Sequence, residues 1–505
     1  MKHEPPAQEQ SIFVVSLRGP FAFQRDTRGE LQAVPAGGSL SRAMSALGRS
    51  HRLTWIAAAI GDDDPAAAAS TRSWPMGNSQ VLLAELPPAA LQLHRRAFAN
   101  PLLWLLQHGM EERLMWPYAE DAIWKTWSRG YRPVNEAMAD AVVAAARGAS
   151  EPVILVQDYH LYLVPRLIRE AIPNARIAHF VHIPWARPHA WSLLPNPIMR
   201  EILAGLMGAD VVGFQTEDDA ERFTATCDAY GLDLENDTTE DPLHPLVRVF
   251  PMTVEQPSVQ DSAAKPTISK VAPLKSDMCN FVQVGELDPR ENTPAALRAF
   301  GLLLERRPDF REHARLVAYL PLSRADLPEY QDEKRTILST VQLVNARFGN
   351  SSWQPIEVNV REDPGLERQL LIDYDALLVP TLADGMNFIA KEGPLLNQRR
   401  GVLILSSASG AWHELQSSAL TIDPKSLTSM TDAMELAIDM GPTERQRRAD
   451  GLRAQITGST VDDWLDDQLA ELGRVAEPDG VQVETQRHFS PVPFLRRHHA
   501  GGLIA

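Results

Sequence analysis

The sequence predicts an α/β protein with two doubly wound domains that face a central cleft. The chain has 505 residues, which is too long for one ordinary core and suits two domains of roughly 200–250 residues each. Its composition, 44% hydrophobic and 23% charged, is that of a globular protein and excludes disorder of the whole chain. Short apolar runs also recur in both halves with longer helical stretches between them. That pattern is typical of parallel sheets covered on both faces by helices.

The expected strands are short and almost continuously apolar, with many β-branched residues. A strand of a covered parallel sheet has this composition because both of its faces are buried. In the first half we expect strands at 11–17, 53–58, 153–157, 176–182 and 211–214. In the second half we expect them at 281–284, 315–320, 376–379 and 402–405.

The composition changes between residues 251 and 279 to Pro, Ser, Thr, Lys and Gln without a long apolar run, which indicates a connection between domains. We therefore expect a Rossmann-like domain at 1–250, a linker at 251–279, a second Rossmann-like domain at 280–475 and a tail at 476–505. Ligands of such folds bind beyond the carboxyl ends of the strands, near points where the strand order reverses. Functional residues should therefore directly follow strands and line the cleft.

Charge and cysteine content exclude several function classes. Lys and Arg number 49 and Asp and Glu number 65, so the formal charge is −16 and nucleic-acid binding is not expected. Two cysteines, Cys227 and Cys279, form neither a disulfide framework nor a CxxC metal motif. The N-terminus lacks the apolar core of a signal peptide, and no apolar run reaches the length of a membrane span. We expect a cytoplasmic protein that binds small molecules, with a homodimer as the default assembly.

Two polar motifs of the first half directly follow expected strands. Asp158 and Tyr159 come after the strand at 153–157, and His182 ends the strand at 176–182. Taken singly, a carboxylate at a strand end is most often a helix cap and a lone histidine is most often a core residue. At neighbouring strand ends, however, the two can face one cleft, and this combination favours a functional role.

Candidate phosphate-binding segments occur in both halves. Arg18 ends the first strand, and Gly38 belongs to a Gly-Gly pair that follows a polar loop. A glycine allows close approach of the backbone to a phosphate, although most such pairs are turns. After the strand at 376–379, a glycine-containing loop leads into a helix whose free N–H groups can hold a diphosphate. Glu392 on that helix can accept hydrogen bonds from the hydroxyls of a ribose. This segment is Asp384, Gly385, Met386, Asn387 and Phe388, followed by Ile389-Ala390-Lys391-Glu392. An ordinary strand–turn–helix is the alternative.

Several motifs in the same order along the chain resemble those of the trehalose-6-phosphate synthase family. They are Asp-Tyr-His at 158–160, His-Ile-Pro at 182–184, Gly-Phe-Gln-Thr at 213–216, Asp-Gly-Met-Asn at 384–387 and Ala-Lys-Glu at 390–392. The resemblance extends from residue 11 to about residue 470. It implies a GT-B fold, in which two Rossmann-like domains face a cleft, and a retaining, metal-independent transferase. It also implies no cofactor, because the nucleoside diphosphate, GDP by resemblance, is part of the donor substrate.

The resemblance assigns roles to individual positions. It implies that the domain at 1–250 binds the acceptor and that the domain at 280–475 binds the nucleotide donor. Asp158 and His182 match residues that contact the acceptor and the donor ring, Tyr159 lies beside the acceptor, and Arg324 matches an arginine that holds the acceptor phosphate. Donor contacts are implied for Arg18, Gly38, Asp384, Gly385, Met386, Asn387, Phe388 and Glu392.

Three positions depart from the family pattern. The family's Arg-Leu-Asp-x-x-Lys-Gly segment supplies two cations to the donor diphosphate, but here the segment contains Glu286 and Glu291 at those places. Arg290 lies one position away, and we expect it to replace the missing cations, so that Asp158, His182 and Arg290 form the catalytic set. An aromatic residue that helps to hold the acceptor phosphate is matched by Arg95.

These departures are similar to those of the family's pseudo-glycosyltransferases. The favoured reading is therefore coupling of a GDP-activated unsaturated cyclitol, GDP-valienol, to validamine 7-phosphate through a C–N bond with retention, which gives validoxylamine A 7'-phosphate and GDP. The alternative is trehalose-6-phosphate synthesis from a nucleoside-diphosphate glucose and glucose 6-phosphate. A third reading, from another class, is a non-catalytic regulatory homologue that binds sugar phosphates.

Overall fold

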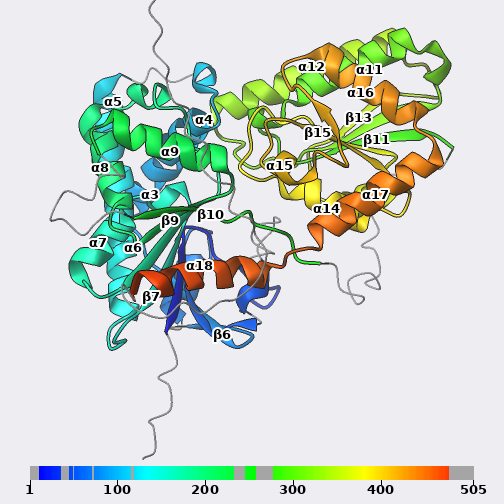
Figure 1. The fold of residues 1–505 in the computed structure, drawn as a ribbon. Coiled ribbons are helices and arrows are strands. Elements are labelled where there is room, and N and C mark those ends of the chain that lie inside the picture. Colours follow the sequence, from blue (N-terminus) through cyan, green and yellow to red (C-terminus); the bar gives the residue numbers. More distant parts are fainter. Residues whose placement is uncertain are drawn as a thin grey trace, which may run out of the picture.

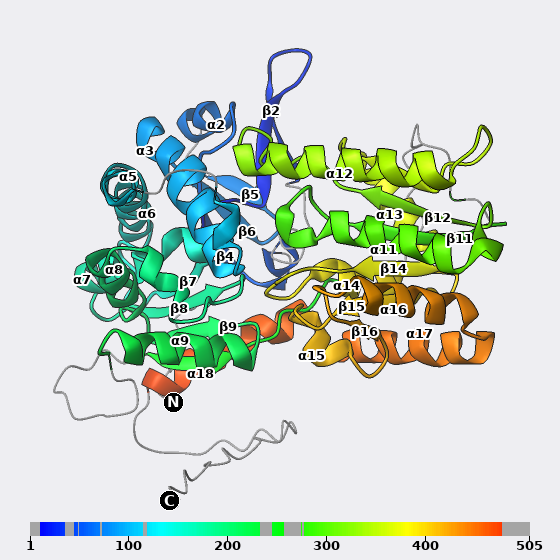
Figure 2. The ribbon, with the colours of Figure 1, turned by 90° about the horizontal axis from the view of Figure 1, so that it is seen from above.

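Two α/β lobes, each built on one sheet, make up the chain in the computed structural model (Figure 1). The structure describes residues 11–35, 45–48, 50–70, 73–114, 119–232, 245–256, 274 and 277–476. Seen from above, the sheets lie side by side, each with its own helices (Figure 2).

The first lobe is built on a sheet with the strand order β10-β9-β8-β7-β1-β4-β6-β5. All neighbouring strands are parallel except β5 and β6. The strand order reverses between β1 and β7, so the loops after these two strands flank a topological switch point, where α/β folds bind ligands. The strands are β1 (Ile12–Ser16), β4 (Leu53–Ala58), β5 (Trp74–Met76), β6 (Ser79–Ala84), β7 (Val153–Gln157), β8 (Arg176–Val181), β9 (Val211–Phe214) and β10 (Leu246–Val249), with a separate hairpin of β2 (Phe21–Arg25) and β3 (Leu31–Pro35).

Helices of the first lobe bury one face of this sheet in a large core, which includes Phe98, Trp127, Tyr131 and Trp185. Asn196-Pro197 at the start of α8 is an example of proline in the first helical turn, where its missing N–H is not needed. The helices are α2 (Asp64–Ser70), α3 (Pro88–Leu93), η1 (His94–Leu103), α4 (Trp104–Gln107), η2 (Glu111–Arg113), α5 (Glu120–Thr126), η3 (Trp127–Tyr131), α6 (Arg132–Ala145), η4 (Tyr159–Leu161), α7 (Val164–Ala171), η5 (Ala190–Leu193), α8 (Asn196–Leu206) and α9 (Glu217–Ala229).

The second lobe is built on a fully parallel sheet with the strand order β13-β12-β11-β14-β15-β16. Its strand order reverses between β11 and β14, which places a second switch point beyond the carboxyl ends of these two strands. The strands are β11 (Cys279–Val284), β12 (Ala314–Tyr319), β13 (Ile356–Asn359), β14 (Ala376–Val379), β15 (Val402–Ser406) and β16 (Leu420–Ile422).

Helices cover both faces of the second sheet. One core joins the sheet to α11, α12 and α16, and the other joins it to α13, α14, α15 and α17. The helices of the second lobe are η6 (Pro289–Glu291), α11 (Thr293–Arg306), η7 (Pro308–Phe310), α12 (Pro328–Phe348), α13 (Pro364–Asp373), α14 (Phe388–Leu396), α15 (Ala411–Leu415), α16 (Leu427–Asp439) and α17 (Pro442–Ile456), and the helix that follows them is α18 (Val461–Ala476).

The last helix, α18, returns to the first lobe (Figure 1). Trp464 and Leu465 of α18 are buried against the free face of the first sheet, where the Trp464 ring lies 5.0 Å from the ring of Phe180. The indole N–H of Trp464 also donates to the carbonyl of Phe250 at 3.1 Å. The range 280–475 expected for the second domain therefore includes a helix that packs on the first sheet.

The fold prediction is confirmed, and the expected buried strands all appear within a residue or two of their predicted bounds. The expected strands do not include β2, β3, β5, β6, β10, β13 and β16, which are partly solvated and therefore lack a continuous buried apolar run. No helix in the described ranges is long and apolar enough to cross a membrane.

Candidate active site

Asp158 directly follows β7 in a backbone conformation that few non-glycine residues adopt. Its φ of 72° and ψ of 171° lie in a region used almost only by glycine, so the surrounding contacts must hold it there. The Asp158 carboxylate accepts a hydrogen bond from the backbone N–H of His182 at 3.2 Å. Burial raises the pKa of Asp158 to about 7, so the carboxyl group is partly protonated at neutral pH.

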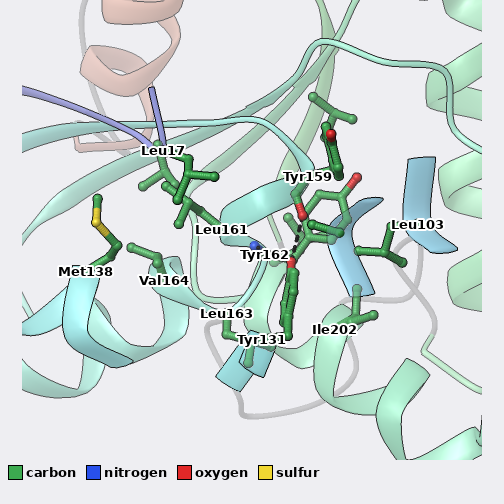
Figure 3. Close-up of a cluster of buried hydrophobic side chains, with 14 of the residues drawn as sticks. Leu17, Leu103, Tyr131, Met138, Tyr159, Leu161, Tyr162, Leu163, Val164 and Ile202 are labelled. Carbon is green, nitrogen blue, oxygen red and sulfur yellow. Dashed lines mark hydrogen bonds between the residues drawn. The ribbon is translucent and has the colours of Figure 1, made fainter. Parts of the chain in front are cut away.

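The loop that carries Asp158 rests on a buried cluster of tyrosine and aliphatic side chains (Figure 3). The Tyr131 hydroxyl donates to the carbonyl of Tyr159 at 2.7 Å and accepts from the N–H of Tyr162 at 3.1 Å. Tyr159 is itself buried, and its hydroxyl donates to Asn100 at 2.8 Å. These bonds fix both ends of the loop, so the position of Asp158 is set by the core beneath it.

His182 follows β8, at the strand end next to Asp158. Its Nε2 lies 2.9 Å from the Gln157 side-chain oxygen, and its ring packs 4.6 Å from the Phe180 ring and 6.1 Å from the Trp464 ring. Burial lowers the pKa of His182 to about 3, which makes the imidazole neutral at physiological pH. A neutral imidazole beside a hydrogen-bonded amide suits contact with ring hydroxyls rather than with a charge.

The segment from Asp384 to Phe388 follows β14 and opens α14, as the sequence predicts. Asn387 adopts a left-handed conformation with φ of 71°, and its side chain caps α14 by accepting from the N–H of Ala390 at 3.0 Å. The Asn387 amide also donates to Asp384 at 3.0 Å. Met386 is buried, whereas Phe388 packs against hydrophobic side chains of both lobes. Glu392 lies one turn further along α14 and is half-buried.

Gly385 brings the two lobes into direct contact. A Cβ atom at this position would overlap the backbone carbonyl of His182 and lie 3.1 Å from the Cα of Ile183. Only glycine therefore allows the second-lobe loop to approach the strand end that carries His182. The loop after β14 in the second lobe therefore contacts the segment after β8 in the first lobe.

Arg290, on η6 after β11, belongs to a buried set of charged side chains that we call the arginine–carboxylate cluster: Asp288, Arg290, Glu291, Arg324 and Asp384. One terminal nitrogen of Arg290 pairs with Asp384, and the other lies 3.0 Å from Glu291. Burial raises the pKa of Glu291 to about 8. Arg290 thus reaches the loop expected to bind the donor, where carboxylates of the chain occupy its terminal nitrogens.

Arg324 is likewise paired within the cluster. Its Nη1 lies 3.0 Å from Asp288 and 3.2 Å from the Tyr330 hydroxyl, and its guanidinium stacks 4.2 Å from the ring centre of Trp104. Burial raises the pKa of the Tyr159 hydroxyl, and the nearby positive charge of Arg324 partly offsets this rise. The arginine expected to hold an acceptor phosphate therefore lies beside the first-lobe loop but is neutralised by Asp288.

Arg18 and Arg95 extend the positive side of the site. Arg95 lies in η1, and its pKa is lowered first by burial and then by the nearby charge of Arg18, with Arg324 contributing as well. Arg18 and Arg324 also help burial to lower the pKa of His160. Three arginines from different parts of the chain thus converge near His160, next to Tyr159. Gly38 lies outside the described residues.

Sequence reasoning missed Trp104, which links the lobes at this point. Its indole N–H donates to Asp288 at 3.1 Å, and both Arg290 and Arg324 lie over its ring, at 5.6 Å and 4.2 Å. Trp104 occurs in an apolar run, a context that predicts only a core residue. Nothing in the sequence indicates that Trp104 contacts Asp288, which lies 184 positions further along the chain.

Two ion pairs join the lobes beside this contact. Arg113 lies 3.0 Å from Glu333, whose side chain is only 1% exposed, and Arg96 lies 2.8 Å from Asp326. Glu333 and Asp326 belong to the second lobe, and their partners belong to the first. The closed arrangement of the cleft is therefore held by charges as well as by the close approach of Gly385.

Comparison with known proteins supports the family resemblance. The model for glycosyltransferase family 20 matches residues 10–474. A bifunctional trehalose-6-phosphate synthase/phosphatase of Thermoproteus tenax is 33% identical over 384 residues, which are 74% of this chain and 51% of that protein. A trehalose-6-phosphate synthase of Mycolicibacterium gilvum is 29% identical over 91% of this chain and 93% of its own. The chain thus spans about half of the Thermoproteus protein, and 64% of a Dictyostelium discoideum trehalose-phosphate synthase that it also matches.

Solved structures agree on the fold. An α,α-trehalose-phosphate synthase (UDP-forming) from Burkholderia vietnamiensis superposes with a TM-score of 0.78 at 24% identity, covering 94% of this chain and 99% of that one. The Burkholderia multivorans α,α-trehalose 6-phosphate synthase has a TM-score of 0.75 at 26% identity, with coverage of 93% and 97%. These neighbours confirm the GT-B arrangement. With a family model that matches nearly the whole described chain, the protein belongs to glycosyltransferase family 20.

Proposed function

We propose that this chain is a retaining glycosyltransferase that moves a six-membered ring from a nucleoside diphosphate to a phosphorylated acceptor. The contact between Gly385 and the His182 carbonyl carries the proposal, because it brings the Asp384–Phe388 loop of one lobe against the Asp158 and His182 strand ends of the other. Such a closed cleft excludes water and holds two rings together, and orientation alone contributes about 7–11 kcal/mol to the lowering of a barrier.

The chemistry follows from the groups near the cleft. A retaining reaction through a covalent intermediate needs a nucleophilic carboxylate about 5 Å from a second carboxyl group. Asp158 does not suit that role, because it is buried, partly protonated and hydrogen-bonded to the His182 backbone. We therefore propose that the donor C–O bond ionises and the acceptor attacks from the same face. The departing phosphate takes the acceptor's proton, Asp158 orients the acceptor, and neutral His182 contacts the donor ring.

Within this class we propose trehalose 6-phosphate as the product, from a nucleoside-diphosphate glucose and glucose 6-phosphate. The relatives' names support this reading, and solved structures with the same fold hold UDP-2-fluoro glucose in one case and glucose 6-phosphate in another. The convergence of Arg18, Arg95 and Arg324 near His160 supports an acceptor that carries a phosphate.

A second candidate, favoured by Glu286 and Glu291, is the reaction of validoxylamine A 7'-phosphate synthase. These carboxylates stand where the family pattern has two cations, so the cradle for a diphosphate is less positive than the pattern predicts. An unsaturated cyclitol spreads the developing cation over its double bond, and the amine of validamine 7-phosphate is a better nucleophile than a hydroxyl. Both properties suit weaker stabilisation of the leaving diphosphate. The same loss of cations is also consistent with a third candidate from another class, a non-catalytic protein that binds sugar phosphates.

One experiment separates these readings. The purified chain is incubated with UDP-glucose or GDP-glucose and glucose 6-phosphate, and separately with GDP-valienol and validamine 7-phosphate, and the products are identified by mass spectrometry. Asp158→Asn tests dependence on the site, and Arg306→Ala, which removes a surface ion pair with Asp432, is the matched control.

A C–O-linked disaccharide phosphate that forms with the control variant but not with Asp158→Asn supports trehalose-6-phosphate synthesis. A C–N-linked product supports the pseudo-glycosyltransferase. Binding of nucleotide or sugar phosphate without any product from either pair refutes the transferase proposal and supports the non-catalytic reading.

A further inference from the structure

Arg290, the cation expected to serve the donor diphosphate, is already paired with carboxylates of its own chain. Its two terminal nitrogens contact Asp384 and Glu291, and its guanidinium lies over the Trp104 ring. The Arg290 side chain is 15% exposed, while those of Glu291 and Asp384 are 4% and 14% exposed. A phosphate group that approaches Arg290 must therefore share it with these two carboxylates.

The Glu291 carboxyl group packs closely against Gly285. A Cβ atom at Gly285 would lie 2.8 Å from the Glu291 carboxyl carbon and from one of its oxygens, so only glycine at this position leaves space for the carboxyl group. The contact between Glu291 and Arg290 is thus a built feature of the loop after β11.

The charged groups that face Glu291 come from several elements. Glu286 and Asp288 lie on its own loop, Arg290 is its neighbour on η6, and Asp384 follows β14. His108 of the first lobe also lies near Arg290, and burial lowers the pKa of His108 to about 4, so it is neutral. Two arginines, Arg290 and Arg324, thus stand against four carboxylates. With all four ionised the group carries a net charge of 2 − 4 = −2, and with Glu291 protonated a net charge of −1.

We propose that Glu291 competes with the donor's phosphate groups for Arg290 and thereby sets the affinity for nucleoside diphosphates. This inference rests on the proposed function, because it assumes that the donor phosphates lie at Arg290. Glu291 is then a specificity-determining residue. The ionised carboxylate of Glu291 repels the diphosphate and pairs with Arg290, whereas the protonated carboxyl group does neither. Burial supports this role, because it gives Glu291 a pKa of about 8, at which both forms are populated near neutral pH.

Affinity for GDP and UDP, measured by titration calorimetry at pH 7 and pH 9, tests the proposal. The protonated fraction of a group with a pKa of about 8 falls about tenfold between these values, so the wild-type affinity should weaken about tenfold. The nucleotide's own phosphate ionises near pH 6 and adds little to this change. Glu291→Gln keeps the shape and removes the charge, so its affinity should match that of the wild type at pH 7 and change less than about twofold by pH 9.

Glu357→Gln is the matched control, because Glu357 pairs with Arg315 near the opposite ends of the strands in the same lobe. It should keep the tenfold pH dependence of the wild type. A wild-type affinity that does not change between pH 7 and pH 9 overturns the proposal, even without a folded Glu291→Gln protein. So does a Glu291→Gln protein that is as pH-dependent as the wild type.

The failure of this inference and that of the proposed function give different results. Product formation with a pH-independent nucleotide affinity overturns only the role of Glu291. A pH-dependent affinity that Glu291→Gln removes, without product from any substrate pair, overturns only the transferase. Absence of nucleotide binding by both proteins at both pH values overturns the role of Glu291, because the donor phosphates then do not lie at Arg290.

Discussion

Replacing Arg290 with alanine should weaken nucleoside diphosphate binding and turnover at least tenfold. The substitution removes one of the two guanidinium groups of the arginine–carboxylate cluster and leaves Asp384 and Glu291 without their cation. A unit charge about 5 Å from a phosphate, at an effective dielectric constant of about 20, contributes roughly 3 kcal/mol. Because Asp384 already pairs with Arg290, and Glu291 does so in its ionised form, we expect about half of this value to be realised. About 1.5 kcal/mol corresponds to slightly more than a tenfold change.

The assay is the dissociation constant for GDP and UDP, together with kcat/KM for the active substrate pair. Arg290→Lys keeps the charge but loses the forked contact to two partners, so it should fall between the wild type and Arg290→Ala. Arg306→Ala removes a surface arginine of the same lobe and should leave both quantities unchanged. Near-wild-type affinity and kinetics for Arg290→Ala would remove Arg290 from the donor site and refute the charge argument.

Three further predictions concern the closed cleft. The pKa of Asp158 is raised from 3.8 to about 7 in the folded chain, so between these pH values the folded state binds more protons than the unfolded state and the free energy of unfolding falls as the pH rises. Asp158→Asn should lack this contribution, and melting temperatures that run parallel for both proteins from about pH 4 to 7 would contradict the prediction. Gly385→Ala should lower kcat/KM about 100-fold, because the new Cβ atom meets the His182 carbonyl and pushes the lobes apart. Small-angle scattering should then detect a larger radius of gyration, and an unchanged radius together with an unchanged kcat/KM would refute the close-contact argument. Arg113→Ala should lower the free energy of unfolding by about 1–2 kcal/mol and the melting temperature by about 2–8 °C, which is less than the loss of a fully buried ion pair because Arg113 is 40% exposed. An equal drop in a Glu333→Gln background would show that the ion pair is not the cause.

The sequence predicts the fold well because local patterns determine it. Buried strands such as 153–157 and 402–405 are continuous apolar runs, and their position along the chain specifies parallel sheets with crossover helices. The same logic locates Asp158, His182 and Asp384, since the first two directly follow such strands and Asp384 lies in the loop after one. Motif order adds the GT-B arrangement, which no single pattern specifies.

Pairing between distant segments is what the sequence leaves open. Arg324 resembles a phosphate ligand in sequence, but in the fold it pairs with Asp288, and Trp104 of the other lobe contacts both side chains. Whether a charge is free or neutralised depends on how two independently specified sheets approach each other. Local periodicity carries no information on that approach, so the partners of Arg290 and Arg324 emerge only from the three-dimensional structure.

The return of α18 to the first sheet has a mechanical consequence. The backbone passes between the lobes twice, and these passages touch: the Thr253 hydroxyl donates to the carbonyl of Ile456 at 3.4 Å. Two neighbouring tethers resist twisting of one lobe about the other far more than a single tether would, whereas bending about the line through them remains easy. Substrate entry and product exit should therefore follow a one-dimensional, clamshell-like swing, in which Trp464 and Phe250 stay together at the pivot while Arg113 and Glu333 separate at the rim.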